Sequence, residues 1–538
     1  MSPAHSIPRR SMLLGAGGLA LGAVPATAST PKEAPALRPG HAPATPPPAG
    51  RSKAQTYRPA YHFSVPDNWK NDPQRPIYID GEYLYYYLYN ADYLEGGFGT
   101  AWRLTTTRDH VHFTDHDVAI PKNSNSNGDC WSGSVVVDHD NTAGYGHGAV
   151  IALVTQAPGE TGQAQYLWYS TDRGRTFQPA GTTPVLANPG TEHFRDPKVI
   201  WDAERSRWFM ANAEGLRIGF YASPDLHHWN EVGEFRRDSL GLLECPDLFQ
   251  MEAADGSSHW ILGISGNAKF RDLPATYAYW TGTFDGATFT PDHEEPQWLD
   301  WGFDFYGAVT YPHHSTDGTE DAALRRVIGW ANFWDYPHNA PSMVTDGYNG
   351  DDMIVRDLSL KRDRDGMYYL SSQPTGALRN YVTAEHHIGD VELTGHLDLD
   401  VRSTAYELSC DITWDPAAQP ANIGFQLRRA PGGARHLAVG AYLEGGYAYV
   451  NRRPTFNPGD GGESQTPIDP ATGRVTFRIL VDNASVELFL DDGRMVHSHR
   501  AFPPVQDNSI RLYVDGGSAV YRNLTIRELE VSANRSPG

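Results

Sequence analysis

Residues 69–80, WKNDPQRPIYID, place the ionisable side chain of Asp72 just before an apolar run that is typical of a buried β-strand. FRDPKVIWD (residues 194–202) and ECPDLFQ (residues 244–250) repeat this arrangement of a carboxylate, a proline and an apolar strand. We call the position at the start of such a strand the strand mouth. A carboxylate at the mouth of a buried strand is costly because burial disfavours its charged form. Three such strand mouths indicate a fold that brings them to one site.

Short β-rich segments recur along the chain at a nearly constant period. Four of them share a strand, an Asp-bearing turn and an aromatic residue, and lie 52 to 64 residues apart; they end at Phe113, Phe177, Trp229 and Phe289. This separation is the length of a four-stranded propeller blade with long loops. The strand mouths are separated by 48 to 65 residues and lie at Asp72, Trp131, Asp196, Glu244 and Asp304. The sequence therefore predicts a β-propeller with five equivalent strand mouths.

The first strand of each propeller blade lines the central channel, so these strand mouths converge on one axial pocket. Carboxylates gathered there raise one another's pKa, and that cost in stability is typical of functional sites. The alternative is that each Asp only caps a turn, since Asp-Pro is a common turn opener. The three carboxylates recur at the same period as the strand repeat, and this favours the functional interpretation.

Residues 1–28 have the features of an export signal. Arg9 and Arg10 precede an apolar run over residues 11–24, and the small residues 26–28 follow it. The paired arginines are similar to a bacterial twin-arginine signal, so we expect a secreted protein. The apolar run has 14 residues, fewer than the roughly 20 that a membrane span needs. No membrane partner is predicted.

Residues 29–56 are rich in Pro and Ala without periodicity, which predicts a flexible linker. The chain has 65 acidic and 44 basic residues, a net charge of −21, which disfavours nucleic acid as a partner. The 3 cysteines lack metal-ligand spacing. Adjacent histidines on a strand point to opposite faces and rarely share an ion. No metal or cofactor is predicted, and nothing indicates an oligomeric state.

From residue 57 onward the chain resembles glycoside hydrolase family 32, the β-fructosidases. Three motifs of that family occur in order: Trp-x-Asn-Asp-Pro at residues 69–73, Arg-Asp-Pro at 195–197 and Glu-Cys at 244–245. The resemblance implies an all-β chain, with a five-bladed β-propeller catalytic domain over residues 57–376 and a β-sandwich over residues 385–531. Within the latter, VDNASVELFLDDG (481–493) is similar to the family's sandwich signature.

Paired carboxylates suit the cleavage of a fructosyl bond, because one protonates the leaving group while the other stabilises the cationic sugar. The resemblance implies that Asp72 is the nucleophile, that Glu244 is the acid/base and that Asp196 holds two fructose hydroxyls. Retaining glycosidases place their two carboxyls about 5 to 5.5 Å apart. The further substrate-binding residues that the resemblance implies are Trp69, Asn71, Gln74, Trp102, Trp131, Ser132, Arg195, Tyr306 and Trp334.

Two departures from the family pattern bear on specificity. Gln74 and Arg75 stand where most members have Asn-Gly, and Leu88 stands where they tend to have Gln. Both resemble the branch that acts on levan, the β-2,6-linked fructan. We therefore expect a retaining β-fructosidase that hydrolyses levan to fructose or levanbiose through a fructosyl-enzyme. The alternative within this branch is a levan fructotransferase that forms cyclic difructose.

Three other activities are compatible with parts of the sequence. An exo-inulinase or invertase would share the carboxylates but not the departures at Gln74 and Arg75. A sialidase would fit STDRGRTF (170–177) as an Asp-box, but only one of the four repeats carries the glycine of that box. A fructan-binding lectin would keep the aromatic residues, yet it has no need for three carboxylates.

Overall fold

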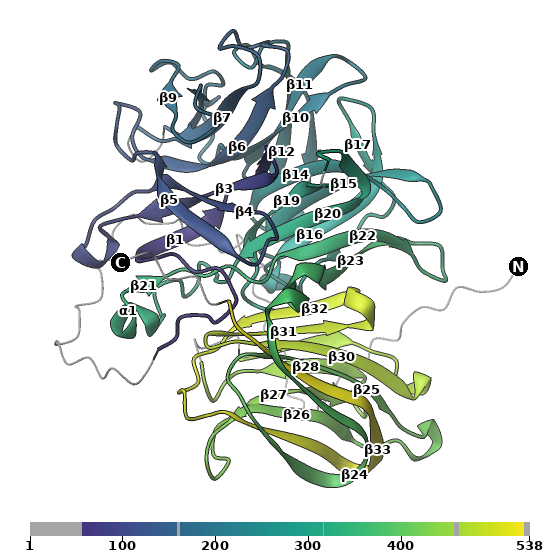
Figure 1. Ribbon diagram of the computed structural model, residues 1–538. Coiled ribbons are helices and arrows are strands. Elements are labelled where there is room, and N and C mark those ends of the chain that lie inside the picture. Colours follow the sequence, from purple (N-terminus) through teal and green to yellow (C-terminus); the bar gives the residue numbers. More distant parts are fainter. Residues whose placement is uncertain (1–55, 159–161, 316, 457–461, 532–538) are drawn as a thin grey trace, which may run out of the picture. The chain divides into compact units, whose positions relative to one another are not determined.

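Five antiparallel sheets follow one another along the chain in the computed structural model (Figure 1). The first three blades comprise β1 (Asn68–Pro73), β3 (Glu82–Asn90), β4 (Ala101–Thr107) and β5 (Phe113–Ile120); β6 (Cys130–Asp138), β7 (Ala149–Gln156), β8 (Ala164–Ser170) and β9 (Gln178–Pro179); and β10 (Arg195–Asp202), β11 (Arg207–Glu214), β12 (Arg217–Ser223) and β13 (Asn230–Arg236). The last two comprise β14 (Leu243–Glu252), β15 (Ser258–Gly266), β16 (Tyr277–Phe284) and β17 (Phe289–Pro291); and β19 (Tyr306–His314), β20 (Glu320–Trp330), β22 (Arg356–Arg362) and β23 (Tyr368–Pro374). The predicted five-bladed propeller is confirmed.

Smaller elements complete the propeller. Three short strands extend its sheets: β2 (Ile77–Ile79), β18 (Gln297–Trp298) and β21 (Tyr348–Asn349), of which the last pairs in parallel with β1. One short α-helix, α1 (Ser342–Thr345), occurs in the described part of the chain. The 3-10 turns among the described residues are η1 (Tyr93–Glu95), η2 (Asp238–Leu240), η3 (Lys269–Arg271), η4 (Gly376–Tyr381), η5 (Pro416–Ala418), η6 (Pro470–Thr472) and η7 (Asp491–Gly493).

The structure describes residues 56–158, 162–315, 317–456 and 462–531. The predicted export signal and the predicted linker, apart from residue 56, lie outside this part of the chain. Within the described ranges, none of the helices combines the length and the apolar character that crossing a membrane requires.

The tyrosine-rich strand β3 shows why these sequences form blades. Its alternating side chains enter two different cores, because neighbouring residues on a strand point to opposite faces. Tyr85 and Tyr87 pack with Val309 of the fifth blade, whereas Tyr86 packs with Val150 of the second. A strand that is covered on both faces is apolar throughout, and this is why a simple alternation of apolar and polar residues is missing here.

Each innermost strand carries a β-bulge at its mouth. The register shift of β1 falls in its second half, between Lys70 and Pro73. In the other four strands it falls within the first residues: between Cys130 and Gly133, Arg195 and Lys198, Glu244 and Asp247, and Tyr306 and Val309. A bulge leaves one residue unpaired and turns its side chain away from the regular pleat. These five bulges therefore aim the mouth residues into the axial channel.

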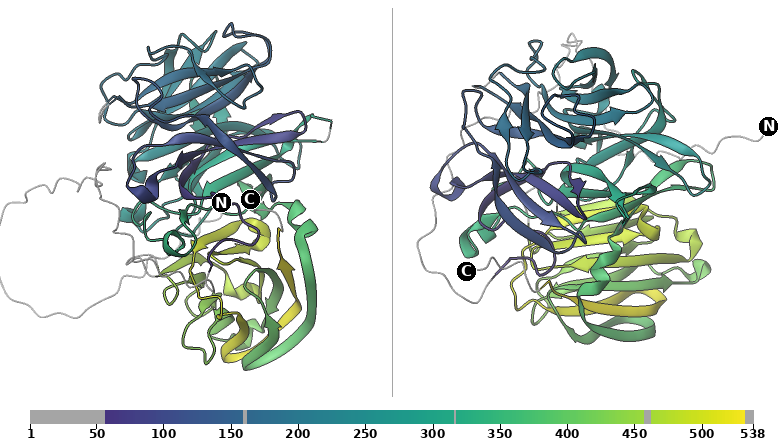
Figure 2. Two further views of the ribbon diagram at one scale, coloured as in Figure 1. Left: turned by 60° about the vertical axis from the view of Figure 1, so that its left-hand side comes forward. Right: turned by 45° about the horizontal axis from the view of Figure 1, so that its top comes forward.

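A β-sandwich follows the propeller, as predicted, and begins at Val382, three residues before the predicted boundary. Its strands are β24 (Val382–Arg402), β25 (Tyr406–Thr413), β26 (Asn422–Arg429), β27 (Leu437–Tyr442), β28 (Tyr447–Asn451), β29 (Glu463–Pro467), β30 (Arg474–Val481), β31 (Ser485–Leu490), β32 (Met495–Arg500) and β33 (Ser509–Leu529). The two longest strands, β24 and β33, run side by side (Figure 2). The first half of β33 pairs with β26 and its second half with β25, so this strand joins both layers.

The sandwich signature, residues 481–493, supplies two buried acids that bind propeller residues. His62 lies 2.8 Å from Asp482 and 2.9 Å from Glu487, and Glu487 also accepts a 2.9 Å bond from Arg356. All four side chains are buried. Burial alone would lower the pKa of His62, but the two carboxylates outweigh it and raise this pKa to about 9.

We expect His62→Gln to lower the free energy of unfolding in a pH-dependent way. The pKa of His62 is raised from 6.5 to about 9 in the folded state, so its contribution is fully present below pH 6.5 and is lost as the pH rises through 9. At about 1.4 kcal/mol per pKa unit, the wild type should be more stable by about 3 kcal/mol near pH 6. Urea unfolding at pH 6, 7.5 and 9 measures this; a difference that does not change with pH would contradict it.

Candidate active site

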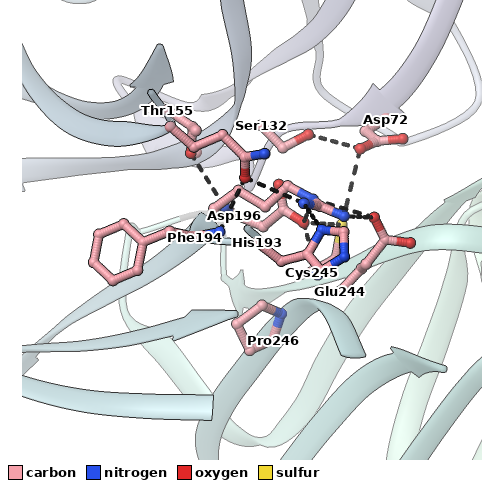
Figure 3. A network of polar contacts seen from close by, with 12 residues as sticks. Asp72, Ser132, Thr155, His193, Phe194, Asp196, Glu244, Cys245 and Pro246 are labelled. Atoms are coloured by element: carbon pink, nitrogen blue, oxygen red, sulfur yellow. Dashed lines mark hydrogen bonds and ion pairs between the residues drawn. The ribbon is translucent and has the colours of Figure 1, made fainter. Parts of the chain in front are cut away.

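The mouths of β1, β10 and β14 bring the three predicted carboxylates together (Figure 3). Asp72, Asp196 and Glu244 are only 9, 3 and 8% exposed. Cys245 lies between the first two: its Sγ is 3.9 Å from Asp72 Oδ2 and 3.7 Å from Asp196 Oδ2. Its backbone N–H donates to Asp196 Oδ2 at 3.1 Å. Three carboxylates from three blades therefore lie close together at one site.

Asp72 accepts hydrogen bonds from neutral groups. Ser132 Oγ donates to Oδ2 at 2.7 Å and Asn71 Nδ2 to Oδ1 at 3.3 Å. Burial raises the pKa of Asp72 and the charge of Glu244 adds to this rise, while the hydrogen bond from Ser132 opposes it. A Cβ at Gly307, whose φ is +56°, would lie 3.0 Å from Asp72 Oδ1. The backbone of the fifth blade thus closes over the carboxylate, and glycine meets both the close approach and the backbone conformation.

Asp196 occupies the more strained position. Its φ is +61°, a left-handed conformation that is unusual for a side chain other than glycine, and the neighbouring site residue Cys245 has a φ of +47°. Burial raises the pKa of Asp196 to about 6; Arg195 opposes this rise, whereas Glu244 and Asp72 add to it. Backbone strain and charge crowding coincide at the predicted site, as they often do where function retains them.

Glu244 is held by charged and neutral donors on its two oxygens. Arg195 Nη2 and Nε donate to Oε1 at 2.9 and 3.3 Å, and Tyr306 OH donates to Oε2 at 2.6 Å. Arg195 in turn is oriented by Gln163 and His193, which accept from its Nη1 at 3.1 and 2.9 Å. The carboxyl group is therefore fixed in direction, as a group that transfers a proton at a defined atom must be.

Aromatic side chains form a wall beside Asp72. The Trp69 ring lies 4.9 Å from Tyr93, 5.1 Å from His338, 5.7 Å from Trp330 and 6.5 Å from Trp334, measured between ring centroids. Trp69 lies on β1, the strand that bears the carboxylate, and its Nε1 donates to Asn71 Oδ1 at 3.0 Å. Flat apolar faces next to directed carboxylates can bind a sugar ring and cleave its glycosidic bond.

Of the nine residues predicted to bind substrate, seven are buried and two are partly exposed. Trp131 and Trp334 are partly exposed, whereas Gln74 and Trp102 are fully buried. Gln74 accepts from the Gly133 N–H at 2.7 Å, and Trp102 Nε1 donates to the Trp131 carbonyl at 2.9 Å. Both buried side chains support the mouth of β6 from behind. Their contact with the substrate stays a prediction.

Arg75 is the main feature that the sequence did not assign to this site. Its side chain is buried, and Nη1 donates to the Gly133 carbonyl at 2.7 Å. Nη2 donates to the Pro246 carbonyl at 2.6 Å and to the Asp196 carbonyl at 3.5 Å. These carbonyls belong to β6, β14 and β10. One guanidinium therefore ties together the strand mouths that bear Ser132, Glu244 and Asp196.

A second charged group lies behind Asp72. Lys70, which is fully buried, forms an ion pair with Asp352, and Tyr85 donates to the same carboxylate. Lys70 Nζ also donates to the Asn71 carbonyl at 3.0 Å. Burial lowers the pKa of Lys70, while Asp352 and Asp72 oppose that change. The pairing therefore holds the backbone of β1 next to Asp72.

At the mouth of the fifth blade, Asp304, the residue that the repeat period pointed to, does not lie with the other carboxylates. Asp304 is fully buried and accepts from the backbone N–H of Arg500 at 2.7 Å and from Tyr336 OH at 2.9 Å; Arg452 forms an ion pair with it. Asp304 thus binds sandwich residues, and Tyr306 is the residue of this mouth that reaches Glu244. The repeat period located the strand mouth correctly but could not show which side chain enters the pocket.

A propeller whose axial pocket holds paired, directed carboxylates defines the class of protein as a glycoside hydrolase. Comparison with known families is consistent with this class. The model for the glycosyl hydrolases family 32 N-terminal domain matches residues 62–374, and the model for the family 32 C-terminal domain matches residues 375–528. The chain belongs to glycoside hydrolase family 32 and is an enzyme of the β-fructosidase type.

Named relatives are similar over most of their length. A levanbiose-producing levanase of Bacillus subtilis is 47% identical over 88% of this chain and 91% of its own. One from Geobacillus stearothermophilus is 46% identical over 74% of this chain and all of its own. Among solved structures, exo-inulinase from Aspergillus awamori has a TM-score of 0.78 at 25% identity, covering 89% of this chain and 99% of its own.

We predict that Asp72→Ala, Asp196→Ala and Glu244→Ala each lower kcat by about 10²- to 10⁴-fold or more, because each removes an interaction that the transition state requires. The fold should persist, since each change relieves the crowding of buried carboxylates. Steady-state kinetics with circular dichroism measure both effects. A folded variant with near-normal kcat would remove that residue from the catalytic set.

Arg75→Met should lower kcat by about tenfold to 100-fold while KM changes less, because a displacement of about 1 Å at catalytic groups costs up to 100-fold. Arg75→Lys should recover only part of the loss, since a compact ammonium cannot span three carbonyls as the planar guanidinium does. Kinetics on protein of verified fold measure this. An unchanged kcat in Arg75→Met would show that the ties do not position the carboxylates.

Proposed function

We propose that this enzyme hydrolyses the β-2,6 linkages of levan and releases levanbiose. The observation that carries the proposal is that Asp72 and Glu244 come from two blades to one site, where Asp72 is held by neutral donors and Glu244 by Arg195 and Tyr306. The two levanbiose-producing levanases at 46 and 47% identity support the choice of fructan and product, since the match spans 91% or more of their length.

The reaction proceeds in two displacements at the anomeric carbon of the fructosyl unit. Asp72 attacks this carbon while Glu244 donates its proton to the departing glycosidic oxygen, so one C–O bond forms as the other breaks. Glu244, now ionised, takes a proton from a water molecule, whose oxygen displaces Asp72 and regenerates the resting enzyme. Two displacements at one carbon retain its configuration.

Asp196 and Arg195 support these steps but form no covalent bond with the sugar. Asp196, next to Asp72 through Cys245, is placed to accept hydrogen bonds from fructosyl hydroxyls, which strengthen as positive charge develops on the ring. Arg195 stabilises Glu244 when the glutamate is ionised, between proton donation and proton uptake.

We also propose that the protein is exported before it acts. The paired arginines, apolar run and small-residue site within residues 1–28 support the twin-arginine route. A polymeric substrate is consistent with action outside the cell. Expression of the full chain with fractionation of cells and medium tests this: a mature protein in the medium that begins near residue 29 is expected, and full-length protein retained inside the cell would contradict it.

Separate incubation with levan, inulin and sucrose tests the proposed reaction. We expect kcat/KM on levan to be at least about tenfold higher than on the other two, a difference of about 1.4 kcal/mol in transition-state stabilisation. Reducing ends should appear in step with bond cleavage, and levanbiose should be the main product by chromatography. Equal kcat/KM on levan and inulin would contradict the linkage preference. Cyclic, non-reducing difructose as the main product would show a fructotransferase.

A further inference from the structure

The two most exposed large apolar side chains of the described residues lie at the same end of the propeller. Phe270 is 67% exposed and Phe98 is 64% exposed. Each follows the second strand of its blade: Phe98 connects β3 to β4, and Phe270, on η3, connects β15 to β16. Because β3 and β15 run antiparallel to the innermost strands β1 and β14, these connections return to the end at which the innermost strands begin. Exposed aromatic surface therefore gathers at the end that holds the carboxylates.

Phe270 is held outward by ties on both of its neighbours. Lys269 Nζ forms an ion pair with Asp335 and lies 4.0 Å from the centroid of the Phe333 ring. Arg271 forms a two-pronged ion pair with Glu295, at 3.1 and 3.2 Å. Because both neighbours of Phe270 form ion pairs, the Phe270 ring points to solvent and does not pack into the core.

Phe270 also lies close to the acid/base. A Cβ on Gly241 would be 3.6 Å from Phe270 Cε1, so the ring packs against this glycine. Gly241 precedes Glu244 by three residues, which span at most about 11 Å of chain. On its other side, η3 is tied to Asp335, the neighbour of Trp334 in the aromatic wall. The Phe270 ring therefore lies between the residues that precede Glu244 and the aromatic wall around Trp69.

We infer that Phe270 is a binding platform for fructosyl units of the polymer that lie beyond the bond being cleaved. An exposed phenyl face gains by packing on the C–H surface of a sugar, because both surfaces lose contact with water. Lys269 and Arg271, on either side of the ring, are already paired with Asp335 and Glu295, so the ring is the uncharged feature of this turn that can contact a neutral chain. This inference rests on the proposed action on fructan.

Kinetics on a long and a short substrate test the platform. Phe270→Ala should lower kcat/KM on levan by about three- to tenfold, the range of one aromatic contact. Activity on levantriose, the trisaccharide, should stay within about twofold of wild type, where such a difference corresponds to less than half a kcal/mol. Phe270→Trp should retain the rate on levan, since a larger aromatic face remains.

Leu397→Ala is the matched control, because Leu397 is also exposed but lies on β24 of the sandwich. It should change neither rate. If Phe270→Ala lowered kcat/KM equally on levan and on levantriose, the platform proposal would be overturned, since the effect would then arise at the cleavage site. An unchanged rate on levan would overturn it as well. If the wild type released no reducing sugar from levan, the proposed function would fail first, and the two failures are therefore distinguishable.

Discussion

The bulge at the mouth of each innermost strand is the constraint on which the catalytic site depends. A regular β-strand points alternate side chains into the cores between neighbouring blades, as β3 does. The register shifts release the mouth residues from that alternation and turn Asp72, Asp196 and Glu244 toward the axis. The positive φ of Asp196 and Cys245 is the local cost of this turn.

Gathering three buried carboxylates carries an electrostatic cost that the surrounding residues must offset. Two like charges 4 Å apart repel by about 4 kcal/mol at an effective dielectric constant of about 20. The pKa of Asp196, raised to about 6 by burial and its acidic neighbours, reflects this cost. Arg195 offsets it directly through Glu244. Arg75 acts on the backbone instead and holds the strand mouths in place against the repulsion.

The sequence predicted the blades and the convergence of the three carboxylates, because both depend on features that repeat along the chain, whereas the sandwich and the role of each carboxylate came from the resemblance to the family. The period of the strand mouths predicted the blades, and the acidic residues in phase with it predicted the pocket. The role of Arg75 could not be predicted, since its partners are carbonyls up to 171 residues away. Gln74 and Trp102 show the same limit: the sequence placed them near the site, but their hydrogen bonds to Gly133 and Trp131 depend on packing between blades.

Trapping of the covalent intermediate tests the central claim, that Asp72 is the nucleophile and Glu244 the acid/base. A fructosyl donor with a good leaving group, such as β-fructofuranosyl fluoride, needs no proton from Glu244, so Glu244→Ala should form the ester with Asp72 but hydrolyse it slowly. Mass spectrometry of the digested protein should find one added fructosyl group on the peptide that contains Asp72. A fructosyl group on a different residue, or no adduct while the donor is consumed, would contradict the account.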